Sequence, residues 1–486
     1  MGGKSVVVIG SGPGGAAAAA LMAHAGHRVT LLERNPFCGG KCSSLPRGGF
    51  AVDTGVHMFG RGPHGPFGEI SRILGCGPEW TARRPSFTLS LSGRGRLEMA
   101  SSLFHPLSVL NFLRGRLKGW QRMGWASTAA RSLRHLGAGG VADLAGRFHD
   151  PRCPLYHDLQ GVAARDFFAA LSESPDFLRT FHAQAMLTMV LPWHRASMGE
   201  FAYILASTMR AAYLCYPRGG AGAIPAAYLA HLSRSGGEIR TGCAARRIVV
   251  EGNRARGVVT AEGELIPADL VISNAGLANT VELAGRDNLP REYLELADGA
   301  TDSEAFIAVK FFLQGRIRSM RTPCLLHMPD LDPFHMFDYL EDGKVPGDLF
   351  LFVTAPAAWD ASLAPPGRDL LLVGAPAPSG LERSESCRAI LDLAQEIARS
   401  LFPEIDASTV EVERVATPDI ASLSGRRNGG CIGLAQEVGQ DVRQRPPQAT
   451  PIHGLYLVGS DAGGRGIGTE MAADSALRLY HLLKDA

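Results

Sequence analysis

The chain has 486 residues, too many for one ordinary hydrophobic core, so we expect two domains or an interleaved pair. Hydrophobic residues make up 45% and charged residues 20%, as in a folded soluble protein, and no apolar stretch is long enough to predict a membrane span. The net charge of +2 provides no bulk attraction to nucleic acid.

The nine cysteines are scattered and include no Cys-x-x-Cys pair. This argues against a disulfide framework or a zinc site and favours a cytoplasmic location. No other group of residues has the spacing of metal ligands, so no metal site is predicted. The N-terminus lacks the long apolar region of a signal peptide and runs directly into a predicted strand.

The first predicted elements form a βαβ unit. Ser5–Ile9 is a short β-branched apolar run, typical of a buried parallel strand. The alanine-rich segment Ala16–Ala25 predicts a tightly packed helix that Gly26 ends as a C-terminal cap. Arg28–Leu32 predicts the second strand.

The turn between the first strand and the helix carries a glycine motif of the form G-x-G-x-x-G. Its residues are Gly10, Gly12, Pro13, Gly14 and Gly15. The first glycine allows a tight turn, the second lets the backbone approach a pyrophosphate, and the last lets helix and strand pack closely. The helix N-terminus offers N–H groups to phosphates. Glu33 ends the second strand, where a carboxylate can accept hydrogen bonds from ribose hydroxyls. The sequence therefore predicts a dinucleotide site.

The middle of the chain alternates between helical and strand patterns. From Pro85 to about Arg210, apolar and cationic residues mix at helical spacing and predict mainly helices. Strands are expected within Gly236–Gly257, around a turn at Glu251, and over Leu265–Ser273. Between residues 305 and 375, alternation of period two predicts an antiparallel sheet. Its strands are expected at Ala305–Leu313, Asp348–Val353 and Leu370–Val373.

The C-terminal part closes the chain with a second glycine-rich turn. An amphipathic helix is predicted over Ser386–Phe402 and a buried strand over Gly454–Val458. The strand leads into a turn that contains Gly459, Ser460, Asp461, Gly466, Ile467 and Gly468. A final helix follows and ends near Leu483.

Two further segments connect these turns to a known family. Glu33 is followed by Arg34-Asn-Pro-Phe-Cys-Gly39-Gly40-Lys41 and later by Asp53-Thr-Gly55-Val56-His57-Met58. With the C-terminal turn, they resemble the extended fingerprint of the flavin family that includes amine oxidases, phytoene desaturases, carotenoid isomerases and retinol saturases. The pattern is nearest the phytoene desaturase and carotenoid isomerase branch. Lys41 stands where arginine is commoner, and Ser460 separates the Gly and Asp of the family's Gly-Asp signature.

The resemblance implies FAD, bound non-covalently, and a role for each matching segment. Gly39 and Gly40 would let the backbone pass close to the diphosphate, and Lys41 would face the flavin side. Asp461 would bind a ribityl hydroxyl, and Gly466, Ile467 and Gly468 would place a helix N-terminus under the flavin pyrimidine. By the same resemblance, the strand at Ala245 would meet the adenine, Asn274 would end the strand that returns to the flavin, and Val56, His57 and Met58 would pass near the isoalloxazine.

The implied fold is of the α/β class. A Rossmann-type FAD-binding domain would be assembled from residues 1–80, 216–300 and 426–486. It would be interleaved with an α+β substrate domain of residues 81–215 and 301–425.

Residues 83–142 are rich in lysine and arginine, contain one acid, Glu98, and interleave apolar residues and tryptophans. Basic amphipathic helices near residues 104–135 predict a peripheral contact with a membrane surface, which would suit a substrate dissolved in lipid. A solvated cationic face over a core-facing stripe is the alternative interpretation.

Three functions are compatible with these patterns. The first is an FAD-dependent oxidoreductase that desaturates, saturates or isomerises a long apolar isoprenoid or polyene, with hydride transfer at flavin N5. The second is a flavin amine oxidase, although the positions that correspond to its aromatic cage hold Ile432 and Ile467. The third is a non-catalytic prenyl-binding protein with the architecture of Rab GDP-dissociation inhibitors. His57 is the candidate catalytic residue for proton transfer, with a structural histidine as the alternative. The sequence identifies no redox acceptor.

Overall fold

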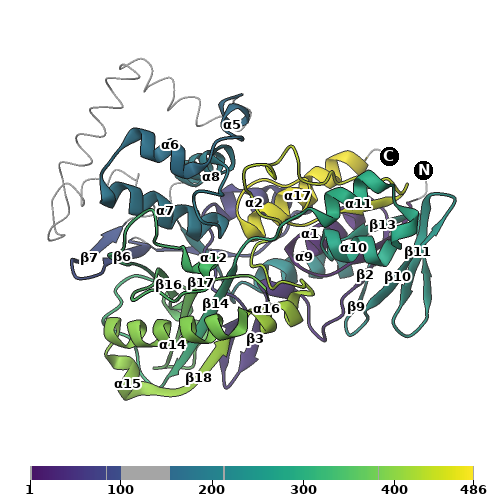
Figure 1. Ribbon diagram of the computed structural model, residues 1–486. Coiled ribbons are helices and arrows are strands. Elements are labelled where there is room, and N and C mark those ends of the chain that lie inside the picture. Colours follow the sequence, from purple (N-terminus) through teal and green to yellow (C-terminus); the bar gives the residue numbers. More distant parts are fainter. Residues whose placement is uncertain (1–2, 84, 100–153, 212–213, 381–382, 485–486) are drawn as a thin grey trace.

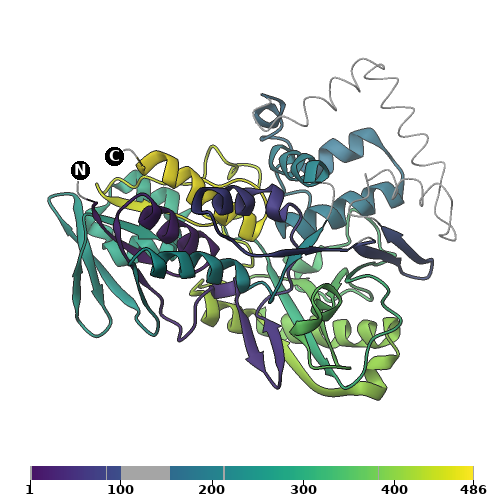
Figure 2. The same cartoon turned by 180° about the vertical axis from the view of Figure 1, so that it is seen from behind.

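The computed structural model describes residues 3–83, 85–99, 154–211, 214–380 and 383–484. Two β-sheets form its framework (Figure 1), a parallel sheet near the chain termini and a larger mixed sheet farther from them. Helices pack against both sheets, and Figure 2 shows the same arrangement from behind.

The parallel sheet is assembled from distant parts of the chain. Its order is β19-β13-β1-β2-β9, and every neighbouring pair is parallel. The strands are β1 (Ser5–Ile9), β2 (Arg28–Leu32), β9 (Glu238–Arg240), β13 (Leu270–Ser273) and β19 (Leu455–Leu457). Parallel strands bring their carboxyl ends to one edge of a sheet, so the turns after β1, β13 and β19 meet there.

The two faces of this sheet are covered by different elements, because alternate residues of β1 point to opposite sides. Val6 and Val8 share a core with a helical layer, whereas Val7 and Ile9 share a core with a small antiparallel sheet and two helices. The helical layer consists of α1 (Pro13–His24), α2 (Pro66–Leu74), α9 (Ala223–Arg234) and α17 (Gly468–Leu483). The other face carries β10 (Ala245–Glu251), β11 (Arg254–Thr260), β12 (Leu265–Pro267), α10 (Leu277–Ala284) and α11 (Arg291–Asp298).

The mixed sheet has the order β18-β14-β17-β16-β15-β6-β7. Its strands are β6 (Phe87–Leu91), β7 (Gly95–Met99), β14 (Ala305–Leu313), β15 (Cys324–Met328), β16 (Leu351–Thr354), β17 (Asp369–Ala377) and β18 (Thr409–Val415). All neighbours are antiparallel except β15 and β6. The long amphipathic helix α14 (Ser384–Leu401) packs against β14 and β17.

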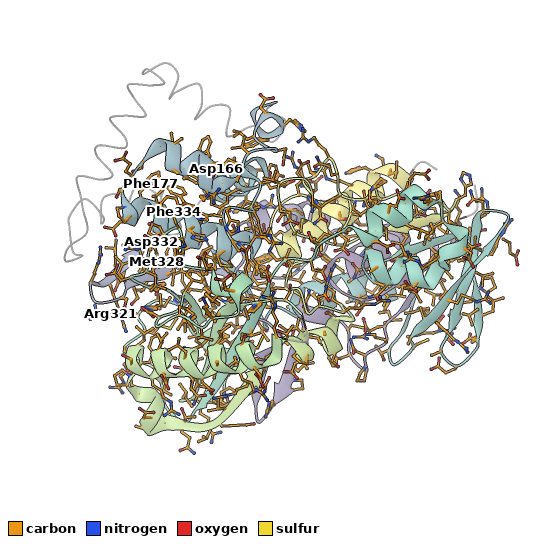
Figure 3. All side chains as sticks on the ribbon, viewed as in Figure 1. Asp166, Phe177, Arg321, Met328, Asp332 and Phe334 are labelled. Atoms are coloured by element: carbon orange, nitrogen blue, oxygen red, sulfur yellow. The ribbon has the colours of Figure 1, made fainter. Side chains whose placement is uncertain are left out.

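Shorter elements fill the space around these layers. Two antiparallel pairs link the layers, β3 (Ser44–Arg47) with β4 (Phe50–Asp53) and β5 (Trp80–Ala82) with β8 (Cys215–Pro217). Four short helices flank the mixed sheet, α12 (Tyr339–Asp342), α13 (Pro356–Trp359), α15 (Glu404–Ser408) and α16 (Thr417–Ser424). A helical layer beyond the sheet contains α5 (Pro154–Asp158), α6 (Ala164–Leu171), α7 (Pro175–Met189) and α8 (Met198–Ala211). Figure 3 places Phe177 and Phe334 at this end of the molecule, away from the β10–β11 hairpin.

Several predicted elements are confirmed with their bounds, and others are corrected. Ser5–Ile9, Arg28–Leu32 and Ala305–Leu313 are strands as predicted. The single strand expected over Leu265–Ser273 is wrong: it is divided into β12, which ends at Pro267, and β13, which belongs to the parallel sheet. Proline has no N–H to extend the pairing, so it suits a strand end. The first predicted helix begins earlier than expected, at Pro13, where proline suits the first helical position.

The region from Pro85 to Arg210 is also not mainly helical at its start, because β6 and β7 form an edge of the mixed sheet. Residues 104–135, predicted to contact a membrane, lie outside the described residues. Within the described ranges, none of the helices combines the length and the hydropathy needed to cross a bilayer.

Candidate functional site

A cavity of about 870 Å³ lies at the carboxyl edge of the parallel sheet and extends to the mixed sheet. Most residues that the sequence predicted for the site line this one cavity. They are Gly10, Gly12, Pro13, Gly14, Glu33, Arg34, Gly40, Lys41, Val56, His57, Met58, Ala245, Asn274, Gly459, Asp461, Ile467 and Gly468. Gly15, Gly39 and Gly466 are absent from its wall, although each is next to a residue that lines it.

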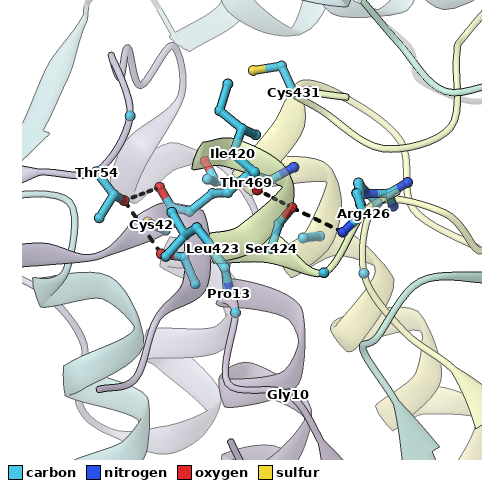
Figure 4. A pocket seen from close by; sticks show the side chains of 18 of the residues that line it. Gly10, Pro13, Cys42, Thr54, Ile420, Leu423, Ser424, Arg426, Cys431 and Thr469 are labelled. Carbon is cyan, nitrogen blue, oxygen red and sulfur yellow. Dashed lines mark hydrogen bonds between the residues drawn. The ribbon is translucent and has the colours of Figure 1, made fainter. Parts of the chain in front are cut away.

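Two glycines of the turn after β1 leave no room for a side chain. A Cβ atom at Gly15 would lie 1.9 Å from the carbonyl oxygen of Gly10, so this glycine allows α1 to start against β1. A Cβ atom at Gly14 would lie 2.9 Å from Cα of Gly459, which brings the N-terminal and C-terminal glycine turns together. Gly12 caps α1 without a side-chain hydrogen bond, so N–H groups at the helix start remain for an anionic ligand. Figure 4 shows Gly10 and Pro13 beside the cavity.

Glu33 is fixed at the cavity wall by the same turn. Its Oε2 accepts hydrogen bonds from the backbone N–H (2.9 Å) and the hydroxyl of Ser11. Its Oε1 accepts one from the N–H of Asn35 (2.8 Å). The Ser11 hydroxyl also accepts a hydrogen bond from the N–H of Gly39 (2.9 Å). The carboxylate is thus buried and oriented before a ligand arrives, as a ribose-binding acid requires.

The glycine pair directs Lys41 to the cavity. Gly39 and Gly40 have φ angles of 110° and 56°, a left-handed backbone that glycine adopts readily. Lys41 follows in the short 3-10 helix Gly40–Cys42, and its Nζ donates to the carbonyl oxygen of Gly430 (3.0 Å). Burial, reinforced by the neighbouring Arg426, lowers the pKa of Lys41 to about 8. A negatively charged ligand group would therefore stabilise its protonated form.

Asp461 belongs to a buried charge cluster that the sequence analysis did not identify. Its carboxylate accepts hydrogen bonds from the Arg426 guanidinium and from the N–H groups of Leu277 (2.9 Å) and Leu434 (3.2 Å). Arg426 also donates to Asp302 (2.6 Å). Burial opposes ionisation of Asp461, but Arg426 and the backbone donors outweigh it, so the pKa of this carboxyl lies below its usual value. A ribityl hydroxyl would therefore add to a carboxylate that already has protein partners.

Arg426 gave no sequence signal because it is one of two adjacent arginines in a glycine-rich loop. Its role depends on Asp302 and Asp461, which are far away along the chain. Figure 4 shows Arg426 beside Ser424, whose Oγ accepts a hydrogen bond from the Arg426 N–H (3.3 Å).

His57 lines the cavity, but its ring is engaged by the protein. Its Nε2 lies 2.9 Å from the carbonyl oxygen of Lys41, and its ring stacks on Phe59 with centroids 5.8 Å apart. A carbonyl can only accept, so Nε2 carries the hydrogen. Burial lowers the pKa of His57 below its usual value, which keeps the imidazole neutral near neutral pH. These contacts favour a positioning role for His57 over proton transfer.

The far wall of the cavity is largely apolar. Its apolar residues include Leu187, Val190, Phe306, Ala308, Phe352, Val415 and Ile432. A Cβ atom at Gly374 would lie 2.4 Å from Cε1 of Phe306 and 3.1 Å from Cγ2 of Val56, so the Phe306 ring occupies the space over this glycine. The sequence predicted the strand that carries Phe306 but not which of its faces lines the cavity.

This arrangement fits a flavin dinucleotide. The wall of one cavity includes Glu33, Ala245 and Lys41 together with the Val56–Met58 segment and the N-terminus of α17. Burial raises the pKa of Cys431, and a protonated thiol is a poor nucleophile, which fits a cofactor that is not tethered there. Among the described residues, no group of three or more His, Cys, Asp or Glu side chains is arranged to hold a metal ion.

Comparison with known proteins agrees with this geometry. Residues 14–479 match the family model described as flavin containing amine oxidoreductase. The chain is 30% identical to the zeta-carotene-forming phytoene desaturase of Myxococcus xanthus, with 96% of this chain and 92% of that protein covered. It is 25% identical to the all-trans-retinol 13,14-reductase of Macaca fascicularis, covering 99% and 87%. It is 26% identical to the chloroplastic prolycopene isomerase of Daucus carota, covering 95% and 77%.

Solved structures share the fold. An oxidoreductase from Methanosarcina mazei superposes with a TM-score of 0.73 at 21% identity, covering 98% of this chain and 100% of that one. Putrescine oxidase bound to putrescine superposes with a TM-score of 0.66 at 14% identity, covering 99% and 98%. These likenesses concern the fold, and they confirm the predicted α/β class.

Proposed function

Because this chain belongs to the flavin-containing amine oxidoreductase family, and is an FAD-dependent oxidoreductase, we propose that its substrate is a long apolar isoprenoid or polyene. The observation that carries this proposal is the continuity of the cavity, whose wall includes both the glycine turns and apolar side chains of the mixed sheet. A cofactor held by the first wall and an apolar chain held by the second would meet inside one cavity.

Each predicted site residue would then have a place along the cofactor. Gly12, Pro13 and Gly14 would hold the pyrophosphate with the start of α1, with Gly10 and Gly15 shaping that turn. Glu33 would accept hydrogen bonds from the adenosine ribose, beside Arg34, and Ala245 would meet the adenine. The proposed FAD domain comprises residues 1–80, 216–300 and 426–486, and the proposed substrate domain comprises residues 81–215 and 301–425.

The flavin end would be held by the second glycine turn and the Lys41 segment. Lys41 would supply positive charge, and Gly39 and Gly40 would let the backbone before it approach the cofactor closely. Asp461 and Gly459 would lie at the ribityl chain beside Asn274. Gly466, Ile467 and Gly468 precede or begin α17, whose N-terminus carries the positive end of the helix dipole.

Bound FAD supplies a two-electron acceptor for a hydride, and the chain's residues would position the substrate and exclude water. Phe306, Val190 and Ile432 would form dry walls around the reacting part of the substrate. His57 would act as a positioning residue, because its hydrogen bond to the Lys41 carbonyl oxygen ties the Val56–Met58 segment to the backbone of Lys41. Desaturation, saturation and isomerisation all need such a dry, apolar surface.

The names of the relatives support a polyene substrate. They describe a phytoene desaturase, a prolycopene isomerase and a retinol reductase, which are 25 to 30% identical over nearly the whole chain. An amine substrate is less well supported, because Ile432 and Ile467, which both line the cavity, cannot form an aromatic cage. A non-catalytic role is set aside because the family is one of oxidoreductases. The membrane contact predicted near residues 104–135 stays a prediction.

The test is a product assay with the FAD-loaded protein. Detergent-dispersed phytoene, a cis-carotene and all-trans-retinol would be incubated with it and separated by chromatography, with putrescine as the amine control. Retinol would be tested with the flavin chemically reduced. A product from a polyene and none from putrescine would support the proposal. Oxidation of putrescine, with every polyene unchanged, would refute it.

A further inference from the structure

One face of β14 forms a wall of the cavity. Phe306, Ala308 and Lys310 line it, at the period of two that places residues on one face of a strand. The intervening residues Ile307 and Val309 are buried in the core that includes residues of α14. The cavity wall therefore changes along one strand from an aromatic ring to a methyl group and then to a cation.

Lys310 is buried and has a carboxylate as its neighbour. Its side chain is 4% exposed. Its Nζ lies 3.0 Å from Oε1 of Glu413, the residue of β18 that pairs with Lys310 in the sheet. Glu413 also pairs with Arg47 of β3, and Arg47 pairs with Glu411. The two cations and two carboxylates balance in charge. Arg47 and Glu413 line the cavity with Lys310, and Figure 1 shows β3 beside β18.

The ammonium group has more hydrogen-bonding capacity than this pair uses. A lysine offers three N–H donors, and among the described residues Lys310 forms one ion pair, with Glu413. Glu413 has Arg47 as a second partner, so the carboxylate does not depend on Lys310 for compensation. An aliphatic residue at this position would avoid the cost of burying a cation. A hydrocarbon chain that filled the cavity would increase that cost, because it displaces water and offers no acceptor.

The positions of Phe306 and Lys310 along β14 indicate how a ligand would be oriented in the cavity. Phe306 lies over Gly374 beside Val56, and Val56 adjoins His57 on the wall assigned to the flavin. Lys310 is four residues farther along the strand, a distance of roughly 13 Å at the rise of an extended strand. The cation is therefore displaced along the strand from the Phe306 ring, on the same face.

We propose that the substrate carries a neutral oxygen, an alcohol or a carbonyl, at one end of its apolar chain, and that Lys310 donates a hydrogen bond to this oxygen. This inference rests on the proposed function and narrows its substrate class. The apolar chain passes Ala308 and reaches Phe306, and the polar end stays at Lys310. Glu411 and Glu413 already balance both local cations, so a neutral oxygen fits better than a carboxylate.

The test compares three polyene probes on FAD-loaded protein. All-trans-retinol supplies an alcohol, retinoic acid a carboxylate, and lycopene a hydrocarbon, each dispersed in the same detergent. Binding is followed by the change in the visible flavin band. The variants are Lys310→Met and Lys310→Arg, and Lys344→Met is the matched control because Lys344 is exposed and does not line the cavity.

We expect Lys310→Met to weaken retinol binding about tenfold or more, since it removes a hydrogen bond from a charged donor. Lycopene binding should be unchanged or stronger, Lys310→Arg should retain retinol binding, and Lys344→Met should behave as the parent. If Lys310→Met does not fold, Glu413→Gln provides a second test. It keeps the donor and removes the competing carboxylate, so retinoic acid should bind several-fold more tightly than it binds the parent.

Equal weakening of retinol and lycopene by Lys310→Met, or no weakening of either, would overturn the inference. Tighter binding of retinoic acid than of retinol by the parent would also overturn it. If no polyene changes the flavin band of the parent, the proposed function itself fails. This failure is distinguished from a failure of the Lys310 inference because it is seen with the parent protein alone, before any variant is tested.

Discussion

The hydroxyl of Ser11 donates a hydrogen bond to the Glu33 carboxylate and accepts one from the Gly39 N–H at 2.9 Å. One small side chain therefore connects the first glycine turn, the acid at the end of β2 and the glycine pair. In a Rossmann-type site the turn binds the pyrophosphate and the acid binds the adjoining adenosine ribose. Their relative position consequently depends on Ser11.

Replacing Ser11 with alanine should weaken FAD binding about tenfold and lower the free energy of unfolding by about 1–3 kcal/mol, because a buried carboxylate loses a donor. Fluorescence titration of the apoprotein with FAD and urea unfolding would measure the two effects. Ser235→Ala is the control, since Ser235 is exposed at the end of α9. Equal FAD affinity in both variants would show that Ser11 does not organise the site.

Gly15→Ala should give a protein that is poorly folded or purifies without flavin. The new Cβ atom would lie 1.9 Å from the Gly10 carbonyl oxygen, and backbone cannot move aside as a flexible side chain can. The ratio of flavin to protein absorbance, together with the melting temperature, measures the result. Gly347→Ala is the matched control, because nothing lies within 4 Å of a Cβ atom there. A yellow, stable Gly15→Ala protein would contradict the predicted packing.

FAD affinity should fall as the pH rises through about 8. Burial lowers the pKa of Lys41 in the free protein to about 8, from a usual value of 10.5. Below that pH Lys41 is already charged, whereas above it the protein must take up a proton to present a cation to the cofactor. The affinity is therefore fully present below about pH 8 and declines above it. Titrations of the apoprotein from about pH 7 to 9 should show this decline.

The control for this pH dependence is Lys41→Arg, because arginine keeps its charge over the whole range. Its FAD affinity should vary less with pH than that of the parent. The same slope in both proteins would show that another group controls binding.

Gly374→Ala should weaken the binding of the polyene substrate and leave FAD bound. The added methyl group would lie 2.4 Å from the Phe306 ring and would push that ring into the cavity. We expect KM for the polyene to rise about tenfold, the effect of overpacking by 1–3 kcal/mol. The double variant Gly374→Ala with Phe306→Ala should recover much of this loss, because the displaced ring is gone. A loss of flavin in the single variant would contradict the assigned position of Phe306.

The sequence predicted those parts of the fold that depend on local patterns. Ser5–Ile9 and Ala305–Leu313 are recognisable because burial on both faces, or on alternate positions, leaves a pattern within a few residues. The division of Leu265–Ser273 was missed because the two halves pair with different sheets. Partner choice is a property of the folded chain, which a single apolar run does not record.

The same distinction applies to the site. Gly10, Gly15 and Glu33 were predicted because the phosphate and the ribose require fixed residue types at fixed spacing. Arg426 and Lys310 were not predicted, since each acquires its role from carboxylates far away in the sequence, Asp461 in the first case and Glu413 in the second.

The most direct test of the account is the stoichiometry of an anaerobic reaction between the FAD-loaded protein and detergent-dispersed polyenes, phytoene first. The visible spectrum would report oxidised flavin, and chromatography would report the conjugated product. For desaturation we predict that oxidised flavin disappears in equal amount to the new double bonds. For isomerisation, the carbon–carbon double-bond geometry would change in the holoprotein but not in the apoprotein. A flavin band and a lipid fraction that both stay unchanged with every polyene would contradict the account.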